Sequence, residues 1–145
     1  MSLQYLLDTN VVSAAMAKEP NPEVLRRLDL HGHACGIASL VWHELVFGVG
    51  RLPPSRRREA LEAFLEDVVR KSFPVLDYDE RAAAWHAGER VRLEAAGTVV
   101  RFVDGQIAAI AHTSSLTLVT ANVRDFRPFS GLVVEDWSKK GRAAR

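Results

Sequence analysis

Short apolar runs alternate along this chain with longer segments in which apolar residues recur at helical spacing. Runs with the length of buried strands lie at 3–7, 34–38, 73–76, 117–120 and 132–135. Strands that alternate with helices form a parallel sheet that is covered by helices on both faces. The pattern therefore predicts an α/β fold: a three-layer α/β/α sandwich around a central, mostly parallel sheet of four to five strands.

Helix signals separate these runs. The clearest periodicity lies at 55–70, where apolar residues form one stripe and charged residues the opposite face. Asn21, which precedes Pro22, predicts a capped helix start, and Ser39 predicts a cap for the helix after the second strand. The segment 77–80 offers a capping box for a long helix. Shorter helices are expected at 11–17 and 107–111, and Pro74 restricts the third strand to an edge or to very few residues.

Length and composition favour one domain. The chain has 145 residues, of which 48% are hydrophobic, enough for a single continuous core. We expect one domain at 1–137 and a polar C-terminal tail at 138–145. No apolar run approaches the ~20 residues of a membrane span, and the N-terminus lacks a basic secretory region. With a single cysteine, Cys35, the sequence predicts a soluble cytoplasmic protein that has no membrane partner.

The charge balance gives no global attraction to nucleic acid. Nineteen basic and 18 acidic residues leave a formal net charge of +1. A polyanionic partner would have to be bound locally, and Arg51 with the run Arg56, Arg57 and Arg58 is the candidate surface. Simple solvation of three arginines at a helix start is the alternative.

Acidic and amide side chains follow several of the apolar runs. Asp8 ends the first run, Glu44 lies on an apolar helix, and Asp104 follows the apolar residues near 100. Asn122 and Asp125 lie in the loop after 117–120. Ligands bind outside the carboxyl ends of parallel strands, so these residues can converge there. Clustered carboxylates repel one another unless a proton or cation intervenes, which predicts a Mg²⁺ or Mn²⁺ site.

Each candidate also has a purely structural explanation. Asp8 could cap a helix, Asp104 with Gly105 could form a turn, and Asn122 could form an Asx-turn that leaves Asp125 on the surface. Thr9, Ser39 and Thr120 could support the acids with their hydroxyl groups or could serve only as caps and turns. Two of the three tryptophans, Trp42 and Trp85, are expected in the core, whereas the position of Trp137 is open. His31 and His33 are too isolated to predict a zinc site.

Four segments resemble the PIN-domain nucleases, and among them the VapC-type toxins of bacterial toxin–antitoxin systems. The resemblance spans nearly the whole chain and rests on the order and spacing of these segments. They are YLLDTNVVS at 5–13, SLVWHEL at 39–45 with Gly48, DGQIAA at 104–109 and TANVRDF at 120–126. By motif position, the metal-binding acids of the family fall on Asp8, Glu44 and Asp104. The fourth acidic position falls on Asn122, and Asp125 is the neighbouring candidate for that role.

The resemblance implies a Mg²⁺-dependent (or Mn²⁺-dependent) endoribonuclease that hydrolyses RNA phosphodiester bonds as a toxin. The implied catalytic residues are Asp8, Glu44, Asp104, Asn122 and Asp125. The implied partners are an RNA substrate, a cognate antitoxin protein and a second copy of the chain in a homodimer. One alternative is a haloacid-dehalogenase-like phosphatase with Asp8 as nucleophile, which would need an acid where Asn10 stands. The other is a non-catalytic module that binds a cation.

Overall fold

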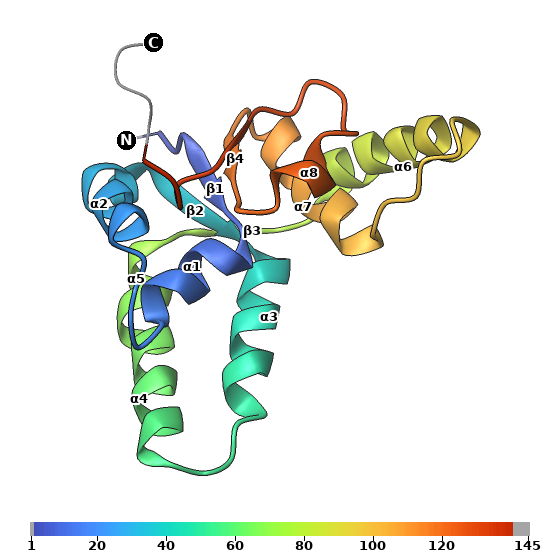
Figure 1. The fold of residues 1–145 in the computed structure, drawn as a ribbon. Coiled ribbons are helices and arrows are strands. Elements are labelled where there is room, and N and C mark those ends of the chain that lie inside the picture. Colours follow the sequence, from blue (N-terminus) through green and yellow to red (C-terminus); the bar gives the residue numbers. More distant parts are fainter. Residues whose placement is uncertain (1, 141–145) are drawn as a thin grey trace.

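A five-stranded sheet forms the centre of the computed structural model, which describes residues 2–140 (Figure 1). All strand pairs are parallel and the strand order is β3-β2-β1-β4-β5. The strands are β1 (Tyr5–Leu7), β2 (Cys35–Ala38), β3 (Val75–Leu76), β4 (Thr117–Val119) and β5 (Val134–Glu135). The sheet confirms the predicted fold class, and β3 lies at an edge, as Pro74 predicts.

Helices flank the sheet. In Figure 1, α1 to α4 lie to the left of the sheet and below it, while α6 and α7 lie to its right. The longest helix, α6, packs along α7. The helical elements are α1 (Thr9–Met16), α2 (Pro22–His31), η1 (Gly32–Ala34), α3 (Ser39–Gly50), α4 (Arg56–Phe64), η2 (Leu65–Val69), α5 (Arg70–Ser72), α6 (Glu80–Ala95), α7 (Phe102–Thr113) and α8 (Val123–Phe126).

The register of the sheet brings the residues that follow β1, β2 and β4 together at the carboxyl ends of the strands. Leu7 lies between Ile37 of β2 and Val119 of β4. The next residue, Asp8, still donates its backbone N–H to the carbonyl of Val119, at 2.9 Å. Because the strands are parallel, the residues that follow β1, β2 and β4 all leave the sheet at the same end. The starts of α1 and α3 and the loop before α8 therefore lie at this end of the sheet.

The predicted helix start at Asn21 is confirmed, a helix does start within 77–80 but without the predicted capping box, and the cap predicted at Ser39 is wrong. The side chain of Asn21 accepts hydrogen bonds from the N–H groups of Glu23 and Val24, and Asp79 accepts from Ala82. Ser39, however, is already the first residue of α3, and Ala38 occupies the capping position with no side-chain bond. Since β2 runs directly into α3, no residue is left between them to act as a polar cap.

The periodic segment 55–70 is helical but not regular. It consists of α4, the π-helical turn η2 and the short α5. Leu65 and Val69 are buried as the stripe predicts, whereas Val68 is 43% exposed. A π turn contains more residues per turn than an α-helix and so shifts the faces that follow it. This shift explains why a stripe drawn with α-helical spacing misplaces Val68.

The core includes a tryptophan that the sequence left open. Trp137 is 1% exposed and lies against Tyr5 and His31, with ring centroids 5.0 and 5.6 Å away. Trp42 and Trp85 are partly buried and pack against the core, as predicted. The domain boundary after residue 137 stays a prediction: the tail begins with described residues, while 141–145 lie outside the described part. Within residues 2–140, no helix has the length and apolar character needed to cross a membrane.

Glu89 connects α6 to the chain that follows α8. Its carboxylate accepts two hydrogen bonds from Arg92, at 2.9 and 3.0 Å, and one from the backbone N–H of Ser130, at 2.6 Å. Arg92 also donates to the carbonyl of Pro128. The hydrogen bonds from Arg92 lower the pKa of Glu89 below its usual value, although burial of the carboxylate opposes them.

We expect Glu89→Gln to destabilise the fold by about 1 to 2 kcal/mol at pH 7, because charge-assisted hydrogen bonds are lost. A depressed pKa stabilises the fold above the unfolded-state value near 4.5, and this stabilisation is lost as pH falls through the folded-state value. The difference in thermal midpoint between wild type and variant should therefore shrink between pH 5 and pH 3. A difference that stays constant over this range would show that the charge of Glu89 is not responsible.

Candidate active site

Asp8 is fixed at the carboxyl end of β1. Its Oδ1 accepts the backbone N–H of Thr9 at 2.8 Å and thereby caps α1. Its Oδ2 accepts hydrogen bonds from Thr120 Oγ1 at 2.8 Å and Asn10 Nδ2 at 3.1 Å. The residue is 7% exposed. Asp8 thus serves as a helix cap, but it also carries a buried, precisely oriented carboxylate, so capping alone does not account for it.

A small polar network holds the loop after β4 against this carboxylate. Besides its bond to Asp8, Thr120 Oγ1 accepts hydrogen bonds from Asn10 Nδ2 and from the backbone N–H of Asn122. Asn10 Oδ1 accepts the backbone N–H of Ala121 at 2.9 Å. The hydroxyl of Thr120 supports Asp8 as the sequence suggested. Asn10 is a structural contributor that sequence reasoning missed, although its place two residues after Asp8 was the available signal.

Glu44 lies on α3, at the same end of the sheet. Its Oε2 accepts a 2.6 Å hydrogen bond from the hydroxyl of Thr9, the residue next to Asp8. Glu44 is partly buried, between the exposed His43 and the buried Leu45. An acid on an otherwise apolar helix is therefore oriented toward the start of α1, and the cation expected near it stays a prediction.

Asp104 lies in the first turn of α7 and is 9% exposed. Reading Asp104 and Gly105 as a turn is wrong, because α7 already begins at Phe102. Gly105 is needed for close packing: a Cβ at this position would lie 2.1 Å from Nε2 of His86 on α6. The sequence thus located α7 but missed its first residues.

The acids lie in a shared electrostatic field. Burial raises the pKa of Asp8, with a further increase from the negative charge of Glu44. Burial likewise raises the pKa of Asp104, and the charges of Asp8, Asp125 and Glu44 add to this effect, while Arg101 opposes it. None of these four acids forms a salt bridge with a basic residue within the described part of the chain. The four predicted acids therefore interact electrostatically, and Arg101 is the basic residue that acts on Asp104.

Asn122 and Asp125 form the exposed side of this group. The side chain of Asn122 makes no capping bond at the start of α8, so the Asx-turn explanation is not supported. Asp125 is exposed, and its charge acts on Asp104. The two side chains line a hollow that also includes Arg124, Arg127 and Lys139.

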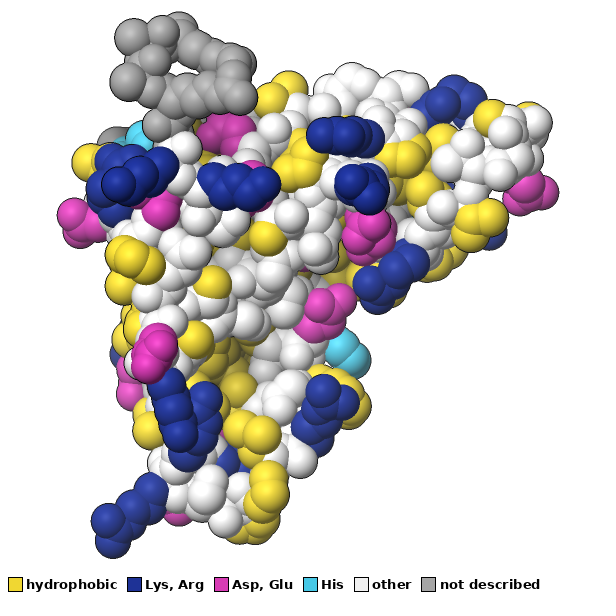
Figure 2. Space-filling view, viewed as in Figure 1, with side chains coloured by type: hydrophobic (Ala, Val, Ile, Leu, Met, Phe, Trp, Pro, Cys, Tyr) yellow, Lys and Arg dark blue, Asp and Glu magenta, His cyan; other side chains and the backbone are white. Residues whose placement is uncertain are grey.

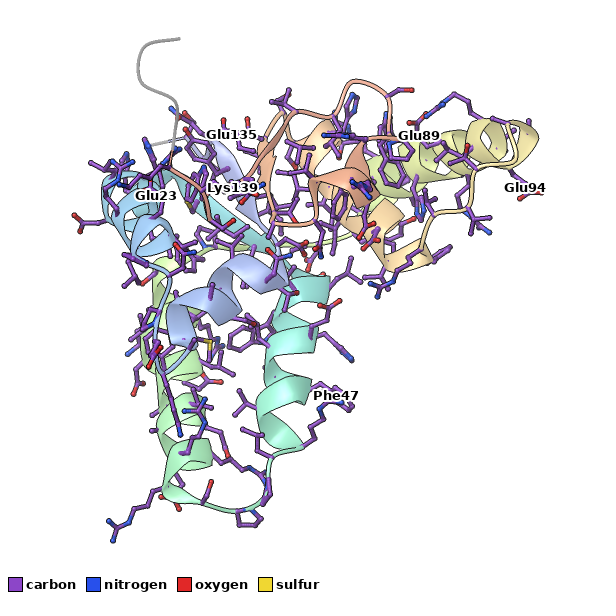
Figure 3. The ribbon with its side chains drawn as sticks, viewed as in Figure 1. Glu23, Phe47, Glu89, Glu94, Glu135 and Lys139 are labelled. Atoms are coloured by element: carbon purple, nitrogen blue, oxygen red, sulfur yellow. The ribbon has the colours of Figure 1, made fainter. Side chains whose placement is uncertain are left out.

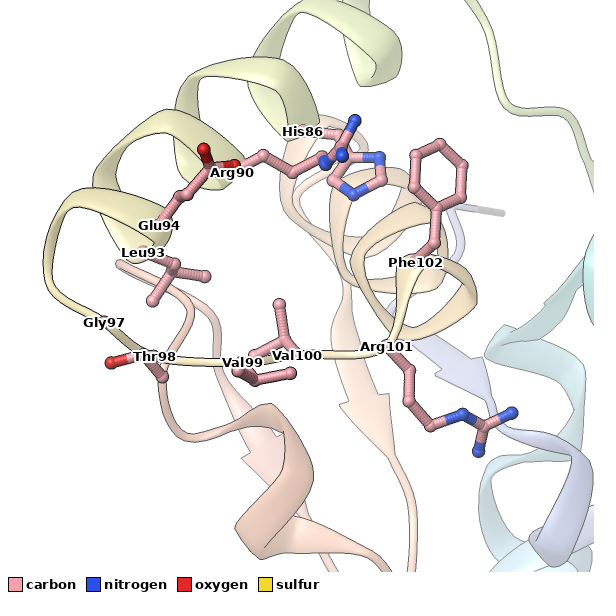
Figure 4. A pocket seen from close by; sticks show the side chains of 10 residues that line it. All are labelled: His86, Arg90, Leu93, Glu94, Gly97, Thr98, Val99, Val100, Arg101 and Phe102. Atoms are coloured by element: carbon pink, nitrogen blue, oxygen red, sulfur yellow. The ribbon is translucent and has the colours of Figure 1, made fainter.

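Arg101 is a basic neighbour of Asp104, and it was not among the site residues predicted from the sequence. It immediately precedes α7 and is exposed. Figure 4 shows its side chain directed away from the hollow between α6 and α7. The only sequence signal was a single arginine within an apolar run.

The acidic side chains are suitable ligands for a hard cation, although they do not surround a single position in this structure. Among residues 2–140, no three acidic, histidine or cysteine side chains already stand close enough to hold one metal ion. Carboxylate oxygens are the ligands that Mg²⁺ and Mn²⁺ prefer, and buried carboxylates without a basic partner are stabilised by a cation. Cys35 does not compete as a nucleophile, because burial raises the pKa of its thiol to about 12.

The fold and the site together define a parallel α/β protein with a buried acid, Asp8, at the carboxyl end of its central strand β1 and with further acids on the helices nearby. Residues 5–131 match the family model described as PIN domain. The chain therefore belongs to the PIN domain family. This match leaves the phosphatase alternative without support.

Two curated relatives and one solved structure show how far the similarity extends. The tRNA(fMet)-specific endonuclease VapC of Salmonella typhimurium is 34% identical, covering 93% of this chain and 98% of the relative. Toxin FitB of Neisseria gonorrhoeae is 32% identical, covering 91% and 97%. The structure of FitAB bound to an IR36 DNA fragment superposes with a TM-score of 0.89 at 26% identity, covering 97% of this chain and all of the other.

Proposed function

We propose that this protein is a Mg²⁺-dependent endoribonuclease that acts as the toxin of a toxin–antitoxin pair, with Mn²⁺ as a possible substitute. The observation that carries the proposal is that Asp8 and Asp104 are both buried in a PIN domain, interact electrostatically with each other and with Glu44, and form no salt bridge within residues 2–140. Full-length similarity to proteins named as VapC endonuclease and FitB toxin supports the same activity.

Asp8, Glu44 and Asp104 would hold the metal. When bound, the ion would supply an activated water and would neutralise charge on the phosphate. Asp8 is oriented for this role by its three hydrogen bonds, and Glu44 by the hydroxyl of Thr9. Asp125 is exposed beside Asp104, so we assign it the fourth acidic role, with Asn122 contacting the substrate at the rim.

The assay that tests this proposal is cleavage of a defined RNA by the purified toxin. Because one relative is named as tRNA(fMet)-specific, initiator tRNA is the first substrate to try, with an elongator tRNA beside it. We expect cleavage with Mg²⁺, loss of cleavage with EDTA, and recovery when Mg²⁺ or Mn²⁺ is added in excess. Metal binding without cleavage of any RNA would instead support the non-catalytic module.

The antitoxin would bind in a groove between α1, α3 and α4. A hollow of about 310 Å³ there is lined largely by apolar residues of these helices and by the junction between α3 and α4, with Arg57 at its side. Figure 2 shows hydrophobic side chains gathered in this hollow. The hollow also includes Thr9 and Glu44, so a segment bound in it would lie beside the acids. A second apolar hollow lies between α1, α2 and the turn η2 and shares no lining residue with the first.

The basic run at the start of α4 remains a candidate RNA contact. Arg58 is already engaged, because it donates to Glu62 at 2.8 Å and to the carbonyl of Leu52 at 3.0 Å. Arg56 and Arg57 keep exposed guanidinium groups that could contact phosphate. The predicted homodimer and cytoplasmic location likewise stay predictions.

A further inference from the structure

Three side chains form a tier along one face of α3 and its C-cap. His43, Phe47 and Arg51 follow one another at four-residue spacing, which places them above one another on a helix. The rings of His43 and Phe47 are stacked, with centroids 6.3 Å apart and planes 17° apart. The guanidinium carbon of Arg51 lies 5.5 Å from the centroid of Phe47. We call these three residues the α3 tier.

The α3 tier is uncovered. Phe47 is 60% exposed, and His43 and Arg51 are exposed beside it. Figure 3 shows Phe47 on the side of α3 that faces away from α4, and therefore outside the apolar groove assigned to the antitoxin. A large aromatic ring left this open is not needed for the core, and its exposure costs free energy in water. The ring is therefore free to contact a ligand.

The α3 tier is continuous with the acids. All three of its members line a hollow of about 570 Å³, and the same hollow is lined by Thr9 and Glu44. Val103, next to Asp104, lines the hollow on the side of α7. A molecule bound against Phe47 would therefore extend directly to Thr9 and Glu44 of the candidate active site.

The charge of the tier favours an anionic ligand. Arg51 forms no salt bridge with the acids of residues 2–140, so its charge is available. Aromatic rings on which bases stack, combined with cations for the backbone, are the usual means of binding single-stranded nucleic acid. A purely apolar peptide would leave the cation beside Phe47 without a counter-charge.

We propose that the α3 tier is a stacking platform for one unpaired nucleobase of the RNA, next to the phosphate that is cleaved. Phe47 supplies the ring face, His43 extends it toward Glu44, and Arg51 contacts the adjoining phosphate. This inference rests on the proposed endoribonuclease function and names the part of the substrate that the site would recognise: an unstacked base in a single-stranded loop.

A second phenylalanine–arginine pair provides a matched comparison. Arg90 lies 4.9 Å from the ring centroid of Phe102, which is 51% exposed. This pair lines a different hollow, of about 290 Å³, between α6, the loop after it and the start of α7 (Figure 4). Glu44 and Thr9 do not line that hollow. Phe102→Ala therefore removes a ring of similar exposure, 51% against 60%, outside the proposed platform.

The test measures binding and cleavage of a single-stranded oligoribonucleotide that carries 2-aminopurine, whose fluorescence falls when it stacks. Binding is measured with Ca²⁺ in place of Mg²⁺, and cleavage with Mg²⁺. For Phe47→Ala we expect about tenfold weaker binding and a loss of the quenching. Phe47→Trp should restore both, and Phe102→Ala should behave as wild type. In cleavage, Phe47→Ala should raise KM and leave kcat nearly unchanged.

Other outcomes would overturn the platform. Unchanged quenching and KM in Phe47→Ala would show that no base stacks there. If Phe47→Ala instead halves the mass measured by analytical ultracentrifugation, the tier is a contact between two copies of the chain. If wild type binds and quenches the probe but cleaves no RNA, the endoribonuclease proposal fails while the platform stands.

Discussion

Asp8→Asn and Asp104→Asn are each expected to lower RNA cleavage at least a hundredfold, because each removes a charged oxygen donor from the proposed metal site. Both acids are almost fully buried, and asparagine has nearly the same shape as aspartate. The measurement is kcat/KM with initiator tRNA at saturating Mg²⁺. In cells, expression of the wild-type toxin without antitoxin should arrest growth, and either variant should relieve the arrest.

For Asp104→Asn this loss should occur without a loss of stability. Burial and the neighbouring acids raise the pKa of Asp104, so its negative charge is unfavourable in the metal-free fold. The thermal midpoint of Asp104→Asn, measured in EDTA, should therefore equal or exceed that of wild type. Asp8→Asn differs: asparagine can still cap α1, but its amide group would face Nδ2 of Asn10, which donates to Asp8 Oδ2, so we expect a lower midpoint for that variant. The opposite effect on activity and stability expected at Asp104 is typical of a functional charge cluster.

Two other acids provide comparisons for the loss of cleavage in these variants. Asp125→Asn should reduce cleavage less than Asp104→Asn does, because Asp125 is exposed and acts from the rim. Asp67→Asn removes an exposed acid from η2 and should change neither activity nor arrest. Full cleavage by both Asp8→Asn and Asp104→Asn, with the fold intact, would refute the metal-dependent mechanism.

The positions of Asp8 and of the loop with Asn122 could be predicted from the sequence, because residues that follow the strands of a parallel sheet emerge at the same end of that sheet. Asp8 directly follows an apolar run, and the loop with Asn122 follows another, so both had to leave the sheet at one edge. The polar Glu44 on an apolar helix was informative for a different reason: a charge among apolar neighbours needs a partner. The order of strands was not required for either inference.

What could not be predicted depends on contacts between residues distant in sequence. The π turn at Leu65–Val69 has no local marker in the pattern, so the exposure of Val68 was missed. Arg101 acts on Asp104 only because α7 begins at Phe102. The α3 tier was also missed, because an apolar helix does not show in its sequence which side faces the core, and only coordinates reveal that Phe47 is exposed.

Trp137 is the largest fully buried side chain among the described residues, so Trp137→Ala should have the largest effect on stability. We expect a loss of about 3 to 5 kcal/mol in the free energy of unfolding, from lost burial and the cavity left behind. The ring lies edge-on to Tyr5 of β1 and beside His31 of α2, and so attaches the chain after β5 to both elements. Urea denaturation monitored by circular dichroism measures the loss.

Two further variants separate the contributions of this side chain. The indole Nε1 donates a 3.0 Å hydrogen bond to Glu135 Oε1, which Trp137→Phe removes while most of the apolar area is kept. We expect that variant to lose about 1 to 2 kcal/mol. Trp42→Ala, at a partly buried position on α3, should cost less than Trp137→Ala because less apolar area is exposed. Equal losses for Trp42→Ala and Trp137→Ala would show that Trp137 contributes no more than a partly buried ring, and the packing of the last strand against β1 and α2 would then not depend on it.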